Sequence, residues 1–139
     1  MNKRVYASVV VAGLSLAATQ LYAHHGAGVF DPDTMVSLTG TVTDFQFVNP
    51  HVLVFMTVTQ EDGTEQQWSG ELTAPMRLSR MTNLNVQWTK DILKPGDEIM
   101  MEGHPANNGA PAMDIITIVN ADGVVLIGGA RANTRLNTN

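Results

Sequence analysis

The sequence contains no cysteine in its 139 residues, and this absence excludes several kinds of chemistry. A chain without cysteine forms no disulfide, binds no metal through thiolates, and has neither a cysteine nucleophile nor a lipid-anchored cysteine. Long apolar runs are also scarce. The one near the start, residues 5–18, is too short to span a bilayer comfortably, and no second run follows. We therefore expect no membrane span, and the length suits one domain with a hydrophobic core.

The first 23 residues have the architecture of a secretory signal peptide. Two basic residues form the start, the apolar run follows, and the segment ends in a small residue, Ala23. We expect cleavage after Ala23, although Leu21, two residues before it, is larger than the side chain usually found at that position of a signal peptide. Cleavage after Ala18 is the alternative. The pattern predicts a bacterial protein that is exported to the periplasm or secreted.

Basic residues are few in the chain that remains after cleavage at Ala23. It carries six basic and 13 acidic residues, a formal net charge of −7. An acidic domain with scattered lysine and arginine binds polyanions poorly, so we expect no nucleic-acid partner. This expectation matters because the fold predicted below often binds nucleic acid.

Residues 36–58 predict a long strand, a rigid corner and a second strand. Apolar or glycine residues occupy every second position from 36 to 42, which is the period of a β-strand. After Asp44 the apolar residues change parity to Phe45 and Phe47, so the strand needs an inserted residue or a sharp bend. The bond between Asn49 and Pro50 then forms a tight corner, because proline cannot donate to a β-ladder. His51 is therefore expected at the start of the second strand.

The rest of the chain predicts four more strands and one helix, separated by glycine-containing turns. Thr73 resembles an N-cap and Pro75 an early-turn proline, which together indicate the start of a short helix. The second strand is predicted at residues 52–58, the four further strands at 65–72, 98–104, 112–119 and a short 124–127, and the helix at 74–84. An all-β domain with a short helix between its third and fourth strands is typical of an OB-like five-stranded Greek-key barrel. The alternative is an open β-sandwich.

The predicted organisation has four parts. Residues 1–23 form the signal peptide, 24–35 an N-terminal arm, 36–127 the OB-like barrel, and 128–139 a disordered tail. The arm is polar and rich in glycine, and it shows no regular period.

A set of short motifs resembles one family of proteins. The motifs are Ala23-His24-His25, Gly40-Thr41-Val42, Val48-Asn49-Pro50-His51, Trp68 with Glu71, Leu93-Lys94-Pro95-Gly96-Asp97, and Glu102-Gly103. The chain from about residue 23 to 127 resembles a family of small exported bacterial proteins catalogued as a domain of unknown function. The resemblance implies an exported, mainly β domain and no established activity. Residues 73–89 depart from the family's pattern.

The histidines suggest a copper site. After cleavage at Ala23, His24 becomes the N-terminal residue, and its free amine and ring Nδ1 can chelate one metal. A second imidazole would complete the T-shaped arrangement known as a histidine brace, and copper(II) prefers such planar nitrogen ligands. His51 is the candidate for this imidazole, and His25 offers a variant that uses its amide and ring. Residues 26–35 reach about 33 Å when extended, so the arm is long enough to fold back along the first strand.

Simpler interpretations of these residues remain open. Two histidines after a signal peptide can form a solvated terminus, and a histidine at a strand start often hydrogen-bonds a nearby carbonyl. His104 is expected to be a surface residue far from His51, because the fourth strand ends near the start of the first. Asp31 and Asp33 lack the repeating oxygen ligands of a calcium loop, so a turn or capping role fits them better.

Other side chains favour packing over chemistry. Methionines at strand and helix periods usually fill a core, so we interpret them in this way rather than as copper(I) ligands. Trp68 with Glu71 can form a ligand surface, but a tryptophan buried in the barrel is the better interpretation. Ser69 lies in no nucleophile elbow, and no serine shares a motif with a histidine base, which argues against a hydrolase.

Two functions of different class follow. The first is a periplasmic copper carrier or buffer that uses His24, His51 and His25, with a copper donor or acceptor protein as its partner. The second is a metal-free module whose barrel recognises a protein or a small ligand of the envelope. We expect no enzyme, because a copper oxidase or oxygenase needs an exposed substrate face and the sequence identifies none.

Overall fold

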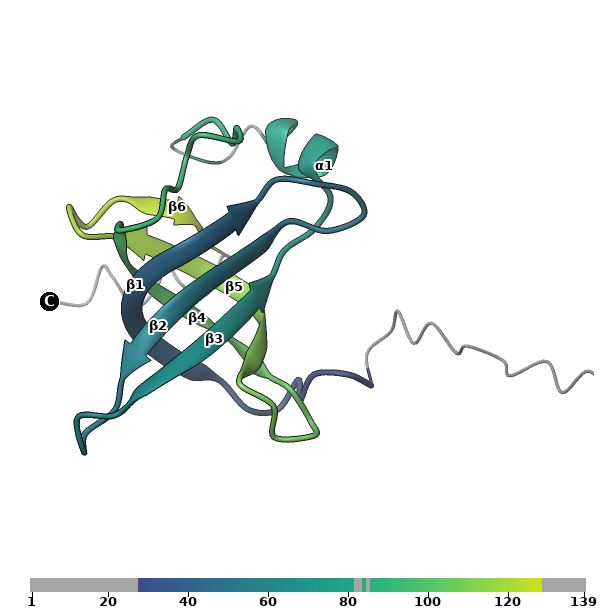
Figure 1. Ribbon diagram of the computed structural model, residues 1–139. Helices are drawn as coiled ribbons and strands as arrows, with labels where there is room; N and C mark the ends of the chain where they lie inside the picture. The colour runs from purple at the N-terminus through teal and green to yellow at the C-terminus, as the bar shows by residue number, and fades with distance from the viewer. Residues whose placement is uncertain (1–27, 82–83, 85, 129–139) are drawn as a thin grey trace, which may run out of the picture.

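The computed structural model describes residues 28–81, 84 and 86–128. Six strands and one helix are present in these residues: β1 Val36–Gln46, β2 Leu53–Thr59, β3 Glu65–Glu71, α1 Pro75–Ser79, β4 Glu98–Pro105, β5 Ala112–Asn120 and β6 Val125–Ile127 (Figure 1). The predicted strands agree with these to within one residue at each end. The predictions for the signal peptide, His24, His25 and the end of the tail concern residues outside the described ones.

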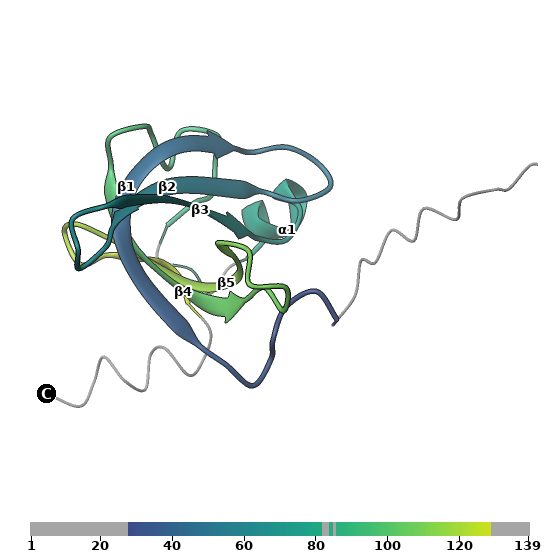
Figure 2. The same cartoon turned by 60° about the horizontal axis from the view of Figure 1, so that its bottom comes forward.

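Five strands close into a barrel. β1 pairs with both β2 and β4, β2 pairs with β3, and β4 pairs with β5, all antiparallel. A parallel pairing of β3 with β5 closes the ring, and β6 adds to the far half of β5. Figure 2 shows β1 curving around the barrel so that it borders two sides. This topology confirms the OB-like barrel and excludes the open sandwich, because a sandwich has no such closing ladder.

The curvature of β1 comes from a bulge and from a glycine. The register between β1 and β2 shifts between Val42 and Asp44, which is the position where the apolar parity changes in the sequence. The inserted residue increases the local bend of the strand. At Gly40 a side chain would place its Cβ 2.4 Å from the carbonyl oxygen of Thr57, so only glycine allows β1 to lie this close to β2 here.

The core fills the inside of the barrel. Buried core side chains come from β1, β2, β4, β5 and β6, together with Leu78 of α1 and two residues of the segment that precedes β4, Trp88 and Leu93. The interpretation of methionine as a core residue is confirmed for Met56, Met101 and Met113, which are fully buried. It is wrong for Met35 and Met76, whose side chains are exposed.

The segment after β3 differs from its prediction. α1 spans five residues rather than the predicted eleven, and its N-cap is Ala74, which makes no side-chain capping bond, so Thr73 is not the cap. Pro75 does occupy the first turn. The buried tryptophan is Trp88, whereas Trp68 is only partly buried near the rim of the core. In the described part of the chain, no helix has the length and apolar character needed to cross a membrane.

Candidate functional site

The corner before β2 positions His51. The Asn49–Pro50 peptide bond is cis, and His51 follows it directly. The chain then runs into β2, where Leu53 lies opposite Glu71 at the end of β3. Nδ1 of His51 forms an ion pair with Oε1 of Glu71, and about a third of each side chain is exposed. A carboxylate behind the ring of a metal-binding histidine fixes its orientation and makes the other nitrogen more basic.

His104 has the same kind of support from a different group. Its Nδ1 lies 2.8 Å from the carbonyl oxygen of Thr34 in the N-terminal arm. A carbonyl oxygen only accepts hydrogen bonds, so Nδ1 of His104 carries the proton and donates it to Thr34. The lone pair of the neutral ring is therefore on Nε2, which is the tautomer that ligates metals.

Asp114 lies between these two histidines. It is paired with Glu71 in the parallel ladder of β3 and β5, and with His104 in the antiparallel ladder of β4 and β5. Burial raises the pKa of Asp114, and the neighbouring charge of Glu71 raises it further, while His104 and His51 act to lower the same pKa. His51, Glu71, Asp114 and His104 thus form one row across three strands, which we call the seam cluster.

The predicted separation of the two histidines is wrong in one respect. The end of β4 does lie beside the start of β1, with Gly103 opposite Val36, as expected. However, the prediction considered only that His51 and His104 lie near opposite ends of β1, and it did not include the closure of the barrel. Closure places the ends of β3 and β4 on either side of β5, so both His51 and His104 interact electrostatically with Asp114.

The N-terminal arm is hydrogen-bonded to the chain near His104 of the seam cluster. The amide of Asp31 donates to the carbonyl of Pro105 at 2.8 Å, and the amide of Asn107 donates to Val29 at 2.9 Å. The side-chain amide of Asn107 also donates to the carbonyl of Gly28 at 2.9 Å. The described arm therefore runs along the end of β4 and the turn that follows, and not back along β1 as the sequence suggested.

Within this arm, the side chain of Asp31 has a structural role. Its carboxylate accepts bonds from the Thr34 hydroxyl at 2.6 Å and from the amide of Asp33 at 3.0 Å. These bonds, with that of the hydroxyl the largest effect, hold the pKa of Asp31 below its ordinary value. The predicted turn role is confirmed for Asp31. Across residues 28–81, 84 and 86–128, no three histidine, aspartate or glutamate side chains are placed to hold a metal ion together.

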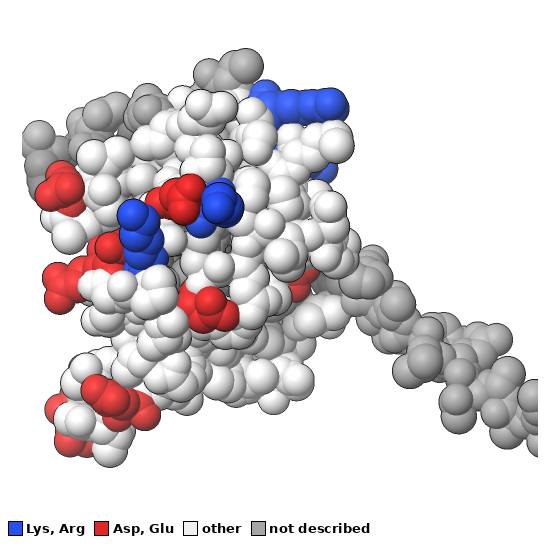
Figure 3. Space-filling view, turned by 45° about the horizontal axis from the view of Figure 1, so that its top comes forward, with Lys and Arg blue, Asp and Glu red and all other residues white. Residues whose placement is uncertain are grey.

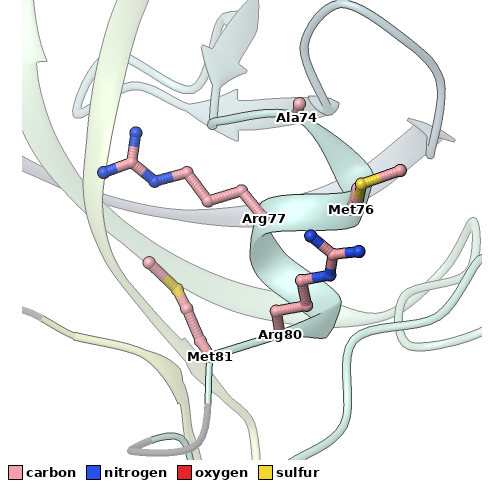
Figure 4. Close-up of a pocket in the computed structure, with 5 residues that line it drawn as sticks. All are labelled: Ala74, Met76, Arg77, Arg80 and Met81. Atoms are coloured by element: carbon pink, nitrogen blue, oxygen red, sulfur yellow. The ribbon is translucent and has the colours of Figure 1, made fainter.

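A second surface lies at α1, the helix that follows the end of β3. A pocket of about 470 Å³ is lined by Ala74, Met76, Arg77, Arg80 and Met81. Figure 4 shows Arg77 and Met81 extending to one side of the helix, with Met76 and Arg80 on the other side. The sequence does not indicate this site, because its methionines have the spacing of core residues and the segment predicts a longer helix than α1. Two arginines and two exposed or half-exposed methionines could bind an anionic, partly apolar group.

The surface charge is mixed. On the face shown in Figure 3, acidic and basic side chains are interspersed, and the described residues of that face form no broad basic area.

A comparison with protein families finds one model that matches most of the chain. Residues 11–113, which run from the predicted signal peptide into β5, match the family of unknown function DUF6152. The chain belongs to this family. The match covers His51, Glu71 and His104 and ends one residue before Asp114. No curated protein matches the chain.

Proposed function

We propose that the protein is exported to the bacterial periplasm and binds copper there as a carrier or buffer. In this proposal the signal peptide is removed after Ala23, so that the amine and ring of His24 chelate copper(II). His51 supplies the second imidazole and His25 a further ligand. A copper donor or acceptor protein would be its partner.

The observation that carries the proposal is the contact between His51 and Glu71. The carboxylate of Glu71 holds Nδ1 of His51, so Nε2 is the nitrogen through which this ring would ligate copper. The described residues hold no complete metal site, so the proposal requires the remaining nitrogens to come from the N-terminus.

The test is an intact mass of the protein after export. The full chain is produced in a bacterial host with its own signal peptide, purified from the periplasm, and measured without copper and with one equivalent of copper(II). We expect a mass that begins at His24 and one copper retained under native conditions. His51→Ala should lose the copper, whereas Val48→Ala, an exposed residue of the same loop, should retain it. A chain that begins elsewhere, or one that begins at His24 and retains no copper, contradicts the proposal.

A second candidate function is a metal-free binding module of the envelope. The pocket at α1 favours it, because Arg77 and Arg80 lie beside apolar methionine side chains on the surface. An anionic ligand or an acidic peptide matches this chemistry. Titration with a short acidic peptide should then shift the backbone amide signals of α1. The double variant Arg77→Gln, Arg80→Gln should abolish these shifts, and His51→Ala should leave them unchanged. Shifts that persist in the double variant exclude this function for the pocket.

A further inference from the structure

The segment that contains α1 differs in charge from the rest of the chain. Residues 72–89 include no aspartate or glutamate, and their two charged side chains are Arg77 and Arg80. The whole chain has more acidic than basic residues, so this cationic segment stands apart from it. Figure 3 shows the basic side chains over α1 at the upper right of the view, apart from the acidic ones. The basic area is small, but screening by salt limits the effect of more distant acidic groups, since the Debye length is about 8 Å at physiological salt.

Neither arginine has an acidic partner in the described part of the chain. The ion pair found there joins His51 to Glu71 and involves no arginine. Glu71 is the acidic residue that precedes the cationic segment, and its carboxylate is engaged by this histidine. The side chains of Arg77 and Arg80 are both exposed, so their charges are accessible to an anionic partner.

Exposed apolar side chains accompany these charges. Met76 of α1 is 62% exposed, and Val48, in the β1–β2 loop of residues 47–52, is 51% exposed. Among the described residues, these two are the most exposed large apolar side chains. Figures 1 and 2 both show the β1–β2 loop beside α1, and the amide of Val52 donates to the carbonyl of Thr73 at 3.3 Å. Apolar side chains that project beside cations are typical of a surface that binds a partner or a membrane.

The shape of this surface favours a membrane over a peptide. The residues that line the pocket all come from one segment, 74–81, so no second element of the described chain forms an opposite wall. A bound peptide usually adds to a sheet edge or lies in a groove. Arg77 and Arg80 extend to different sides of α1 in Figure 4, so they do not converge on one carboxylate. Cations spread around a projecting apolar side chain match the headgroups of a lipid layer instead.

We propose that α1 and the β1–β2 loop form a docking surface for a membrane that contains anionic phospholipids. Met76 and Val48 enter the headgroup region, while Arg77 and Arg80 pair with lipid phosphates. The same lipids repel the acidic remainder of the protein, which orients α1 towards the membrane. This inference rests on the second candidate function, whose surface it shares, and it does not depend on copper binding.

The experiment measures binding of the exported protein to lipid vesicles by co-sedimentation. One set of vesicles contains phosphatidylglycerol and phosphatidylcholine in equal amounts, and the other contains phosphatidylcholine alone. We expect the protein to bind the anionic vesicles about tenfold or more tightly, and to lose this preference at high salt. The double variant Arg77→Gln, Arg80→Gln should weaken binding to the anionic vesicles by about tenfold or more, because each basic residue near such a surface contributes roughly a fivefold factor.

Matched controls separate the α1 surface from general effects of charge and apolar exposure. The double variant Lys90→Gln, Lys94→Gln removes the same charge outside α1 and should bind nearly as the unmodified protein does. Met76→Ser should weaken binding several-fold, because it removes an apolar side chain from the contact. Met35→Ser changes an exposed methionine at the other end of β1 and should have no effect. All of these side chains are exposed, so the variants should fold.

Equal binding to both kinds of vesicle overturns the inference, and so do equal losses in the two double variants. The acidic peptide that tests the second candidate function distinguishes two kinds of failure. If the peptide shifts the amide signals of α1 while the anionic vesicles do not bind, the surface recognises a peptide and only the lipid inference fails. If neither the peptide nor the vesicles bind, the second candidate function fails with it.

Discussion

Glu71 on β3 and Asp114 on β5 lie side by side in the parallel ladder that closes the barrel. All other strand pairings in the described residues are antiparallel. The ladder joins two parts of the chain that are more than 40 residues apart, and each part brings a histidine with it: Glu71 contacts His51, and Asp114 lies opposite His104. The closure that completes the fold is therefore also what assembles the seam cluster.

The first prediction concerns the support that Glu71 gives to His51. Glu71→Ala removes the carboxylate at Nδ1, so the ring loses its fixed orientation and part of its basicity. We expect copper(II) affinity to fall by about 10–100-fold, the usual effect of losing such a supporting group. Chelator competition on the exported protein measures this change.

The control for this prediction is Glu71→Gln. The glutamine amide keeps an oxygen that accepts a bond from Nδ1 but carries no charge. Its copper affinity should lie between that of the unmodified protein and that of Glu71→Ala. Equal affinity in all three proteins means that Glu71 does not support a copper ligand.

The second prediction concerns the close approach of β4 and β5 at Gly103. A Cβ at this position would lie 2.1 Å from the carbonyl oxygen of Asp114, which is a backbone atom and cannot rotate away. Gly103→Ala should therefore lower the free energy of unfolding by about 1–3 kcal/mol or more, the range for overpacked sites. Urea unfolding measures the difference. Gly28→Ala, where a Cβ meets no atom within 4 Å, is the matched control and should unfold like the unmodified protein.

Most of the barrel could be predicted from local patterns. Alternation defined the strands, and the parity change after Asp44 indicated the bulge that the register of β1 and β2 shows. The turns with Gly63, Gly96 and Gly109, all at positive φ, also followed from local sequence. These features depend on residues close together in the chain, so one sequence carries enough information to find them.

The site was harder to predict because it depends on closure. His51 could be predicted as a candidate because it follows Asn49 and Pro50. The rest of the seam cluster, however, comes from three strands. The parity of β3 and β5 does not reveal that Glu71 and Asp114 meet, because register between strands distant in sequence is set by the whole barrel. For the same reason, the sequence predicts only that His104 is a surface residue far from His51.

The third prediction concerns the core tryptophan. Nε1 of Trp88 donates to the carbonyl of Leu126 at 2.9 Å, and its ring, only 1% exposed, lies 6.2 Å from that of Phe45. Trp88→Phe leaves this buried carbonyl without its donor, so we expect a loss of about 1–3 kcal/mol in the free energy of unfolding. Trp68→Phe should cost less, because Trp68 is only partly buried and donates to the exposed Gln66. Equal costs in urea unfolding would contradict the assignment of Trp88 as the core tryptophan.

The fourth prediction concerns pH and the turn between β2 and β3. The Thr64 hydroxyl donates to the Asp62 carboxylate at 2.6 Å, and this bond is the main reason that the pKa of Asp62 lies below 3.8. A lowered pKa means that folding favours the ionised carboxylate. Its stabilising contribution is thus complete above the unfolded value of 3.8 and is lost as the pH falls through the pKa of the folded state.

Thr64→Val removes this hydroxyl and keeps the branched shape of the side chain. We expect the pKa of Asp62, followed by NMR titration of its carboxyl carbon, to rise towards 3.8 while the bond from the Thr64 amide still holds it slightly lower. The stability difference between the variant and the unmodified protein should then shrink as the pH falls below the pKa of the folded state, since the protonated carboxyl no longer distinguishes them through its charge. Thr43→Val, which alters a hydroxyl on β1 bonded to Gln67, should leave the titration of Asp62 unchanged. A pKa of Asp62 that stays the same in Thr64→Val would show that the hydroxyl does not govern this carboxylate.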